Sequence, residues 1–223
     1  MLTQIHPIKV CKLHFKNYCY LLIHKETKEA LLIDPAWEID TIEQALKLHR
    51  VKLVAILLTH HHFDHINLAE PFARLYNIPV LISRIESTYY NFSCMNLLQI
   101  EPFKRVEYGH ISIMPLLTPG HTQGGLCYWI DDVLVTGDTL FIEGCGVCTG
   151  KGGDPNAMFE SLSYLKAIIP PETKIYPGHS FGQEPGKKFS DVLQNNIYLQ
   201  FERREDFIAF RMRSNQKGLL AFI

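Results

Sequence analysis

Segment 59–65 has the sequence THHHFDH, in which three of the four histidines and an aspartate have a spacing that suits metal binding. His60, His62, Asp64 and His65 form an H-x-H-x-D-H spacing. In an extended loop, residues two apart project to the same side, so His60 and His62 can bind one metal ion. Asp64 and His65 face elsewhere and can bind a second ion. The spacing therefore indicates a two-metal site suited to hydrolysis. A solvated, histidine-rich turn is the alternative interpretation.

Two ions need more than four ligands, and the chain offers three further candidates. Each follows an apolar stretch and lies beside a glycine: His121 in TPGHT, Asp138 in TGDT and His179 in YPGHS. Taken singly, each is more often a turn residue. Together they have the number and type needed to complete two coordination spheres, which favours a role as ligands.

The elements that must position these residues follow from the apolar pattern. Residues 53–58 form an unbroken apolar run directly before the histidine segment. Such a run is typical of a central strand that is covered on both faces. Ligands collect at the carboxyl ends of strands in open α/β sheets. The histidines are therefore predicted to lie at the carboxyl end of a buried strand.

Strand and helix signals alternate along the rest of the chain. Asp154-Pro155 opens a helix, since Asp is a good N-cap and Pro suits the first helical position. The order of elements, with antiparallel hairpins, predicts an α/β fold in which two sheets are sandwiched between helical layers. The expected strands are 10–15, 18–24, 30–34, 53–58, 79–83, 111–117, 126–130, 133–136 and 174–176, and the expected helices are 39–48, 66–76 and 154–167.

Composition and length limit the class of protein. The chain has 223 residues, 47% of them apolar, and a formal net charge of -1. This is enough for a sizeable core, and we predict one hydrolase domain over residues 1–185 and a C-terminal helical extension over 186–223. The charge gives no overall attraction to nucleic acid or to an anionic membrane. No apolar run reaches the ~20 residues that span a bilayer, and we expect a cytoplasmic location.

Six cysteines are scattered through the chain, and two of them form one C-x-x-C pair, Cys145 and Cys148. We expect reduced thiols, because the start of the chain has no secretory signal. A structural zinc knuckle would need a second pair. An inert role and a redox role both remain open for Cys145 and Cys148.

Taken together, the motifs resemble the metallo-β-lactamase fold superfamily, and the surrounding residues resemble its glyoxalase II branch. The similarity covers roughly residues 8–180. It implies a four-layer αββα sandwich with a short C-terminal helical appendage. It also implies that His60, His62 and His121 hold one metal, that Asp64, His65 and His179 hold the other, and that Asp138 bridges them. The similar segments are Thr59–His65, Thr118–Thr122, Gly137–Phe141, Gly144–Gly146 and Tyr176–His179.

The ligand types and the family together predict the chemistry. Nitrogen and carboxylate ligands without thiolate suit zinc, iron or manganese, and we expect two Zn²⁺. The resemblance implies that a metal-bound hydroxide hydrolyses an acyl thioester. Asp64 is expected to orient this hydroxide as a catalytic residue. The chain has no G-x-S-x-G motif, which agrees with a mechanism that needs no protein nucleophile.

The substrate prediction depends on two departures from the glyoxalase II branch. A basic residue commonly follows Gly-Cys-Gly in that branch and helps to hold the glutathione carboxylate, whereas Val147 stands here. The glutathione-binding helical domain is reduced to about forty residues. Lys151 could replace the missing charge, or it could be a solvated loop lysine.

Three segments are similar to glyoxalase II-like hydrolases of bacterial polyketide synthase clusters. They are 144–148, 176–182 and the C-terminal segment 196–213. This resemblance implies acyl thioesters on the phosphopantetheine arm of an acyl carrier protein. Arg211 and Arg213 are candidate contacts for substrate or for this acidic partner, although a solvated outer face is an alternative for these basic residues.

Several alternative functions stay open at this point. Within the fold, the chain could be a hydroxyacylglutathione hydrolase, a mononuclear iron persulfide dioxygenase, or a lactonase or phosphodiesterase. From another class, it could be a non-catalytic subunit that binds a carrier protein. The acyl group, the thiol carrier and the oligomeric state are not predicted by the sequence.

Overall fold

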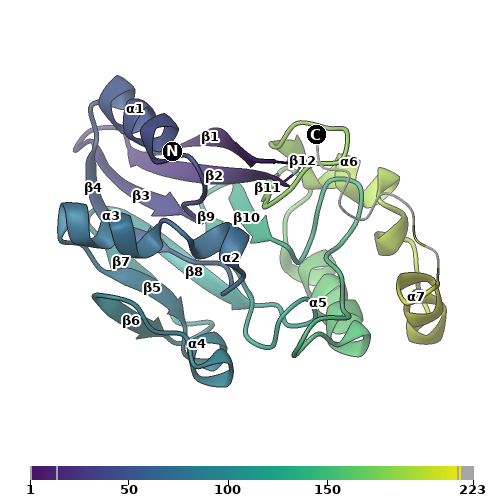
Figure 1. The fold of residues 1–223 in the computed structure, drawn as a ribbon. Helices are drawn as coiled ribbons and strands as arrows, with labels where there is room; N and C mark the ends of the chain where they lie inside the picture. Colours follow the sequence, from purple (N-terminus) through teal and green to yellow (C-terminus); the bar gives the residue numbers. More distant parts are fainter. Residues whose placement is uncertain (1, 14, 215, 217–223) are drawn as a thin grey trace.

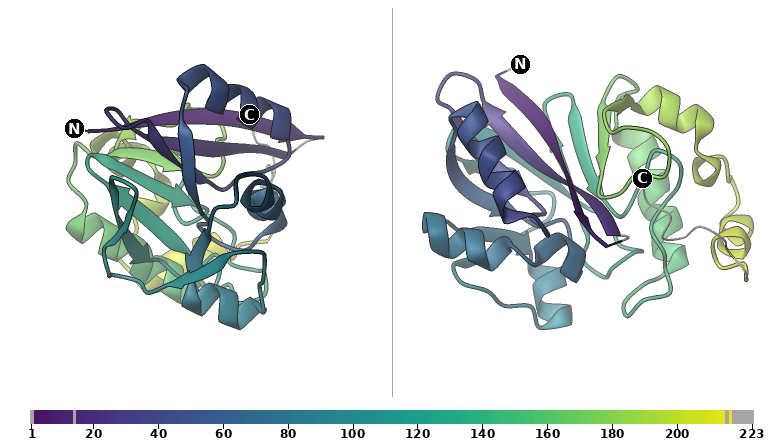
Figure 2. Two further views of the ribbon diagram at one scale, coloured as in Figure 1. Left: turned by 90° about the vertical axis from the view of Figure 1, so that its left-hand side faces the viewer. Right: turned by 45° about the horizontal axis from the view of Figure 1, so that its top comes forward.

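The structure is a computed structural model that describes residues 2–13, 15–214 and 216. The described residues form two six-stranded sheets. Figures 1 and 2 show the sheets packed face to face, with helices on the outer side of each. This arrangement confirms the predicted αββα sandwich.

The first sheet is antiparallel at its start and parallel afterwards. Because its last four strands run in the same direction, their carboxyl ends meet at one edge of the sheet. In spatial order the strands are β1 (Thr3–Lys12), β2 (Phe15–His24), β3 (Glu29–Ile33), β4 (Lys52–Leu57), β5 (Val80–Ser83) and β6 (Leu97–Ile100).

Helices fill the connections between the parallel strands of the first sheet, as parallel pairing requires. They are α1 (Ile39–His49), α2 (Phe63–Ile66), α3 (Ala69–Tyr76) and α4 (Arg84–Tyr90).

The second sheet is antiparallel except for one parallel pair, β10 with β11. β8 and β10 both run against β9, so the carboxyl ends of β8, β10 and β11 also share one edge. In spatial order the strands are β12 (Lys187–Lys188), β11 (Lys174–Pro177), β10 (Val133–Gly137), β9 (Leu126–Ile130), β8 (Ile111–Leu117) and β7 (Val106–Tyr108).

Alternation of side chains along the strands builds the core between the sheets. Tyr18, Tyr20 and Leu22 of β2 pack between the sheets, while the residues between them face the helical layer. β4 behaves in the same way, with Leu57 toward the second sheet and Ile56 toward the helices. The prediction of a central strand covered on both faces is thus confirmed.

The helices after β10 cover the outer face of the second sheet. Met158 and Leu162 of α5 (Pro155–Ile168) share one buried cluster with Phe207 of α7 (Arg204–Arg211). α6 (Phe189–Asn195) and the 3₁₀ helix η1 (Ile197–Leu199) contribute to the same cluster. Between residues 186 and 214 the C-terminal segment is therefore mainly helical, as predicted, whereas residues 215 and 217–223 of the predicted extension lie outside the described residues. The division of the chain at residue 185 stays a prediction.

Some expected elements differ from those observed. The single helix predicted for 66–76 is wrong, because the chain forms α2 and α3 with a break at Asn67 and Leu68. Asn67 Oδ1 accepts a hydrogen bond from the backbone of Trp37, and the Leu68 N–H donates to Pro35. These contacts with the loop after β3 interrupt the helix. α4, β6, β7 and β12 were not predicted.

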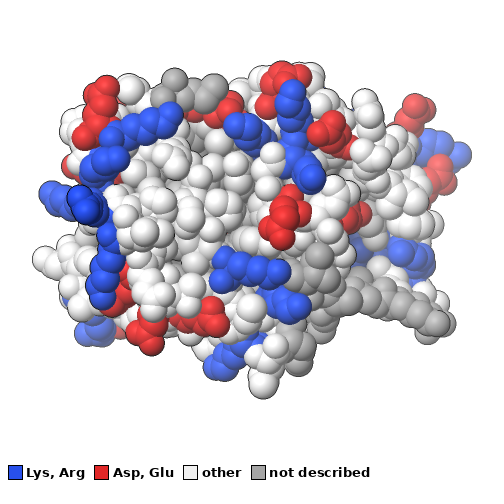
Figure 3. Space-filling view, turned by 90° about the horizontal axis from the view of Figure 1, so that it is seen from above, with Lys and Arg blue, Asp and Glu red and all other residues white. Residues whose placement is uncertain are grey.

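The charges on the surface and the character of the helices agree with the low net charge and the lack of long apolar runs in the sequence. Figure 3 shows Lys and Arg side chains interspersed with Asp and Glu on one face of the molecule. Among the described residues, no helix has the length and apolar character needed to cross a membrane.

Candidate metal centre

The two sheets bring all seven predicted ligands together at one end of the sandwich. His60 and His62 follow β4, and Asp64 and His65 lie in α2. From the second sheet, the ligands follow the three strands whose carboxyl ends share an edge. These are His121 after β8, Asp138 after β10 and His179 after β11. Within each of two groups the potential ligand atoms lie within 4.8 Å of one another, and a third set, His60, His65 and Asp138, overlaps both. The first group is His60, His62 and His121, and the second is Asp64, His65 and His179.

The first group consists of three imidazole rings. His62 Nδ1 lies 3.1 Å from His60 Nε2 and 2.9 Å from His121 Nε2. His60 is almost fully buried, and His62 lines the adjoining pocket. The three nitrogens thus face a common point from two different sheets.

The second group combines one carboxylate with two imidazoles. Asp64 Oδ2 lies 3.3 Å from His179 Nε2 and 3.7 Å from His65 Nε2. Both histidines are almost fully buried. This group therefore offers a mixed nitrogen and oxygen environment beside the first group.

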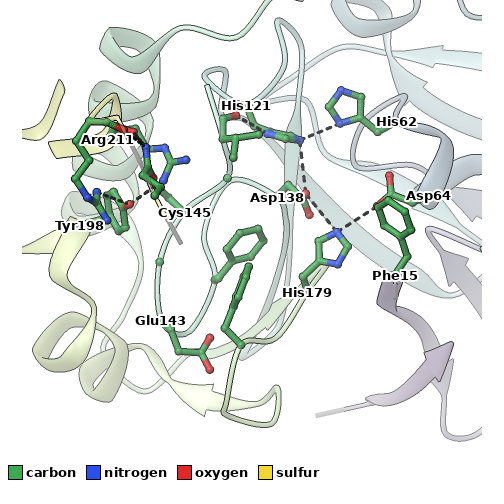
Figure 4. A pocket seen from close by; sticks show the side chains of 17 residues that line it. Phe15, His62, Asp64, His121, Asp138, Glu143, Cys145, His179, Tyr198 and Arg211 are labelled. Carbon is green, nitrogen blue, oxygen red and sulfur yellow. Dashed lines mark hydrogen bonds and ion pairs between the residues drawn. The ribbon is translucent and has the colours of Figure 1, made fainter. Parts of the chain in front are cut away.

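Asp138 lies between the two groups and contacts both (Figure 4). Its Oδ1 is 3.4 Å from His65 Nε2, and its Oδ2 is 3.5 Å from both His121 Nε2 and His179 Nε2. A carboxylate in this position can share its oxygens between two neighbouring ions.

Hydrogen bonds on the outside of the centre determine which ring nitrogen faces inward. A backbone carbonyl or a carboxylate can only accept, so the ring nitrogen beside it must carry the hydrogen. The opposite nitrogen then presents a lone pair to the centre. The outer partners are Asp34 Oδ2 for His65 at 3.1 Å, the Val147 carbonyl for His121 at 2.7 Å and the Lys16 carbonyl for His179 at 2.8 Å.

His60 is oriented in the same way through a hydroxyl. The Thr59 hydroxyl donates its single hydrogen to Asp34 Oδ2 at 2.6 Å, so its oxygen accepts from His60 Nδ1 at 3.0 Å. Nε2 of His60 therefore carries the lone pair. The outer hydrogen bonds of His60, His121 and His179 thus direct ring lone pairs toward the centre, which is an arrangement that a cation stabilises.

Electrostatics keep the first group neutral. Burial lowers the pKa of His60 well below its ordinary value, and the neighbouring imidazoles lower it further. Burial and His121 lower the pKa of His62 to about 4. The pKa of His121 is also lowered, chiefly by burial, against the opposing effect of Asp138. Neutral imidazole is the form that binds a metal.

The second group attracts positive charge. Burial alone would raise the pKa of Asp64, but His65 and His179 outweigh it and hold that pKa well below its usual range. Burial lowers the pKa of His65, whereas Asp138, Asp64 and Asp34 raise it, with a net value of about 10. The ionised carboxylates around the His65 ring thus favour a cation at this point.

Two buried polar atoms without hydrogen-bond partners also indicate that these residues fit divalent metal ions. His65 Nε2 and Asp138 Oδ1 are both buried and have no hydrogen-bond partner. Buried polar atoms are rarely left unpaired, and each such case calls for an explanation. An ion held between these two atoms would satisfy both of them. The nitrogen and oxygen donors suit zinc, iron or manganese.

Asp34 is a functional residue that the sequence analysis did not single out. It is buried at the end of β3, where it accepts hydrogen bonds from Thr59 and from His65. A carboxylate after an apolar strand is the same signal that drew attention to Asp138. The position of Asp34 could therefore have been noticed in the sequence, but its hydrogen bonds with Thr59 and His65 could not.

Asp64 is also held by residues that the sequence did not reveal. Asn17 Nδ2 donates to the Asp64 backbone carbonyl at 3.0 Å and to Oδ2 at 3.2 Å. Trp37 Nε1 in turn donates to Asn17 Oδ1 at 2.8 Å. Both partners come from the first sheet and the loop that follows β3, and no local pattern links them to Asp64.

A buried glutamate joins the two loops that carry the first group. Glu86 lies at the start of α4, directly after the carboxyl end of β5, and is fully buried. Its Oε1 accepts from the backbone N–H of His61 at 3.0 Å and lies 2.7 Å from the His61 ring. Its Oε2 accepts from the Gly124 N–H at 2.8 Å. Since α4 was not predicted, this role could not be anticipated.

A pocket of about 430 Å³ opens beside the centre. Figure 4 shows His62, Asp64, His121, Asp138 and His179 on one side of it. Aromatic rings line its walls, and the C-terminal segment closes the opposite end. The aromatic residues in the walls are Phe15, Phe141, Phe181 and Tyr198.

The three predicted basic contacts differ in their positions. Arg211 and Arg213 line the pocket. Arg211 is only 3% exposed, so it does not belong to a solvated outer face. Lys151 is not among the pocket-lining residues, and its Nζ lies 5.7 Å from the ring centre of Tyr89.

The cysteine pair lies next to the pocket. Cys145 and Cys148 are both free and buried. Burial raises the pKa of the Cys148 thiol to about 11 and that of Cys145 further. Both thiols are therefore protonated at neutral pH and are weak nucleophiles.

Comparison with known proteins places these features in a family. The model of the metallo-beta-lactamase superfamily matches residues 15–179. The chain is 47% identical to the probable polyketide biosynthesis zinc-dependent hydrolase BaeB of Bacillus velezensis, over 98% of this chain and 97% of the relative. It is 31% identical to a probable hydroxyacylglutathione hydrolase of Schizosaccharomyces pombe, over 97% of this chain and 86% of the relative.

Among solved structures, ETHE1 from Myxococcus xanthus is similar in fold. It superposes with a TM-score of 0.82 at 25% sequence identity, and the match covers 97% of this chain and 92% of that one. The expected resemblance to the superfamily, to glyoxalase II-like proteins and to polyketide-cluster hydrolases is thereby confirmed.

Proposed function

The chain belongs to the metallo-β-lactamase superfamily, and we propose that it is a metal-dependent hydrolase that cleaves acyl thioesters. The observation that carries this proposal is the convergence of five imidazoles and two carboxylates from both sheets on one point beside a pocket. In the proposed site, His60, His62 and His121 would hold one ion. Asp64, His65 and His179 would hold the other, and Asp138 would be shared between them.

Zinc is the proposed metal, with iron and manganese as alternatives that the same ligands accept. The printed name of the Bacillus velezensis relative, a zinc-dependent hydrolase, supports this choice. Once bound, two such ions lower the pKa of water and polarise the carbonyl group under attack.

Asp64 is the proposed catalytic residue of the chain. Its low pKa keeps the carboxylate ionised at neutral pH, and Asn17 fixes its direction. Asp64 lines the pocket, where its carboxylate can accept a hydrogen bond from the attacking water and orient it. Water adds to the acyl carbon, the C–S bond breaks, and the products are a carboxylic acid and a free thiol.

The proposed substrate is an acyl thioester of a pantetheine-type thiol, such as an acyl group on a carrier protein. The polyketide name of the Bacillus velezensis relative supports it. The aromatic walls of the pocket suit an apolar acyl group or linker. The similarity to the Schizosaccharomyces pombe protein makes a hydroxyacylglutathione substrate the second candidate.

A panel of thioesters tests the proposal. Enzyme loaded with zinc should release thiol from the same acyl group on pantetheine, coenzyme A, an acyl carrier protein and glutathione at different rates, with the pantetheine-type carriers preferred. Asp64→Asn should lose activity on all of them, because its amide no longer presents a full carboxylate to water. Absence of hydrolysis throughout the panel would contradict the proposal.

The same samples separate the remaining alternatives. Metal analysis of protein purified without added metal, together with oxygen uptake in the presence of a persulfide, identifies a dioxygenase. Carrier-protein binding that survives in Asp64→Asn, without any hydrolysis by the unmodified protein, identifies a binding subunit instead.

A further inference from the structure

A guanidinium without an acidic partner lies in the wall of the pocket. Arg211 is 3% exposed, and among the described residues no carboxylate forms an ion pair with it. Charged side chains are almost never fully buried unless they are paired. The unpaired charge of Arg211 therefore needs an explanation.

The groups around Arg211 solvate it without neutralising it. Nη1 donates to the Tyr198 hydroxyl at 2.7 Å, and the guanidinium carbon lies 5.4 Å from the centre of the Tyr198 ring. Nε is buried without an acceptor. The nearby thiols of Cys145 and Cys148 are protonated at neutral pH and supply no negative charge. A full positive charge thus remains at the pocket wall.

A second guanidinium lies beside the first. Arg213 is exposed and lines the same pocket, and its Nη1 is 3.5 Å from the Tyr198 hydroxyl, to which it donates. The hydroxyl accepts from both arginines, so its own hydrogen can be donated to a ligand. Glu143, a carboxylate that also lines the pocket, accepts from the Gln183 N–H at 2.6 Å and forms no ion pair with either arginine among the described residues.

We propose that Arg211, Arg213 and the Tyr198 hydroxyl form an anion subsite, which binds a carboxylate or phosphate group carried by the thioester substrate. This inference rests on the proposed function and specifies its substrate class. Guanidinium groups bind these two anions in a forked geometry, and a buried hydroxyl adds a third donor.

The subsite lies across one loop from the metal ligands. A side chain on Gly146 would come within 2.0 Å of the Asp138 carbonyl and 2.9 Å of His121 Nδ1, so this loop packs directly on the centre. On its other side, a Cβ on Gly144 would lie 3.5 Å from the Tyr198 ring. One substrate can therefore place its thioester at the metal ligands and an anionic group at Tyr198.

Two matched pairs of substrates test the subsite and locate the anion. The first pair is succinyl and butyryl N-acetylcysteamine, which differ by a carboxylate on the acyl side. The second pair is butyryl phosphopantetheine and butyryl pantetheine, which differ by a phosphate on the thiol side. The anionic member of one pair should have a kcat/KM about tenfold higher or more, mainly through KM, because charged hydrogen bonds are strong.

Variants connect this preference to the two arginines. Arg211→Gln and Arg213→Gln should each reduce the ratio of kcat/KM within the preferred pair. Arg203→Gln is the matched control, because Arg203 lies at the start of the same helix, its side chain is 72% exposed, and it does not line the pocket. Thermal unfolding checks that Arg211→Gln still folds, and Arg213→Gln supplies the test if it does not.

Failure of the anion subsite can be distinguished from failure of the proposed thioester hydrolysis. A preference in the first pair assigns the anion to the acyl group, and one in the second pair assigns it to the thiol. Equal kcat/KM within both pairs, or a preference that both arginine variants retain, overturns the subsite while thioester hydrolysis stands. If no thioester is cleaved, titration calorimetry compares the affinities of the protein for free phosphopantetheine and for free pantetheine. Equal affinities for the two compounds would reject binding of a phosphate at the subsite.

Discussion

At the scale of single residues, the centre is organised by groups that do not touch the proposed ions. Asp34 Oδ2 accepts from both the Thr59 hydroxyl and His65 Nδ1, and the Thr59 hydroxyl accepts from His60. One buried carboxylate thereby orients a ligand in each of the two groups. Such outer partners set ring tautomers and raise the basicity of the ligands.

Asp34→Asn is the first prediction at this scale. The amide has only one acceptor oxygen, so its NH₂ group must face a donor, either Thr59 or His65. We expect the affinity for zinc to fall about 10- to 100-fold, measured by competition with a chromophoric chelator. Asp40→Asn is the control, since Asp40 is exposed in the first turn of α1. Equal affinities in the two variants would contradict this role.

At the scale of elements, the loop 144–147 packs against the proposed metal ligands through Gly146 and against Tyr198 of the C-terminal segment through Gly144. Gly146 approaches the Asp138 carbonyl and His121 so closely that no side chain fits. The same loop provides the Val147 carbonyl that orients His121. A glycine is thus needed here for close packing of backbone against ligand.

Gly146→Ala should therefore disturb both stability and metal binding. Overpacking of this kind costs about 1–3 kcal/mol, which corresponds to a fall in Tm of about 2–4 °C per kcal/mol for a chain of this size. Gly150→Ala is the matched control, because a Cβ there meets nothing within 4 Å. If Gly146→Ala has the Tm and the zinc affinity of Gly150→Ala, the proposed role of the loop is wrong.

The ends of the strands are the part of the site that the sequence predicts best. The ligands were predictable because each follows an apolar strand, and parallel strands bring their carboxyl ends to one edge. Glu86 was not predictable, because α4 is short and its contacts with His61 and Gly124 join distant segments. The burial of Arg211 was equally hidden, since it depends on how α7 packs beside Tyr198. Patterns along a chain predict strand ends, whereas partners across the fold require the packing.

At the scale of the whole molecule, the proposed centre connects the two sheets. His60, His62, Asp64 and His65 come from the first sheet, and His121, Asp138 and His179 come from the second. Elsewhere the sheets are held together mainly by an apolar core, with a few hydrogen bonds such as those from the Tyr20 and Tyr128 hydroxyls to the Pro177 and Leu58 carbonyls. Ions bound to ligands from both sides would add a directional connection between them.

Metal removal should therefore lower the stability of the entire sandwich. An ion that binds only the folded state, at about 1,000 times its Kd, stabilises by about 4 kcal/mol. This corresponds to a Tm about 8–16 °C higher in zinc than after chelation. Differential scanning calorimetry with zinc, with a chelator and with calcium measures the difference. Calcium prefers six to eight oxygen ligands, so it should give a much smaller shift. A Tm that is the same in zinc and in chelator would mean that the seven side chains hold no ion in the folded state, because binding to the folded protein alone must raise its stability.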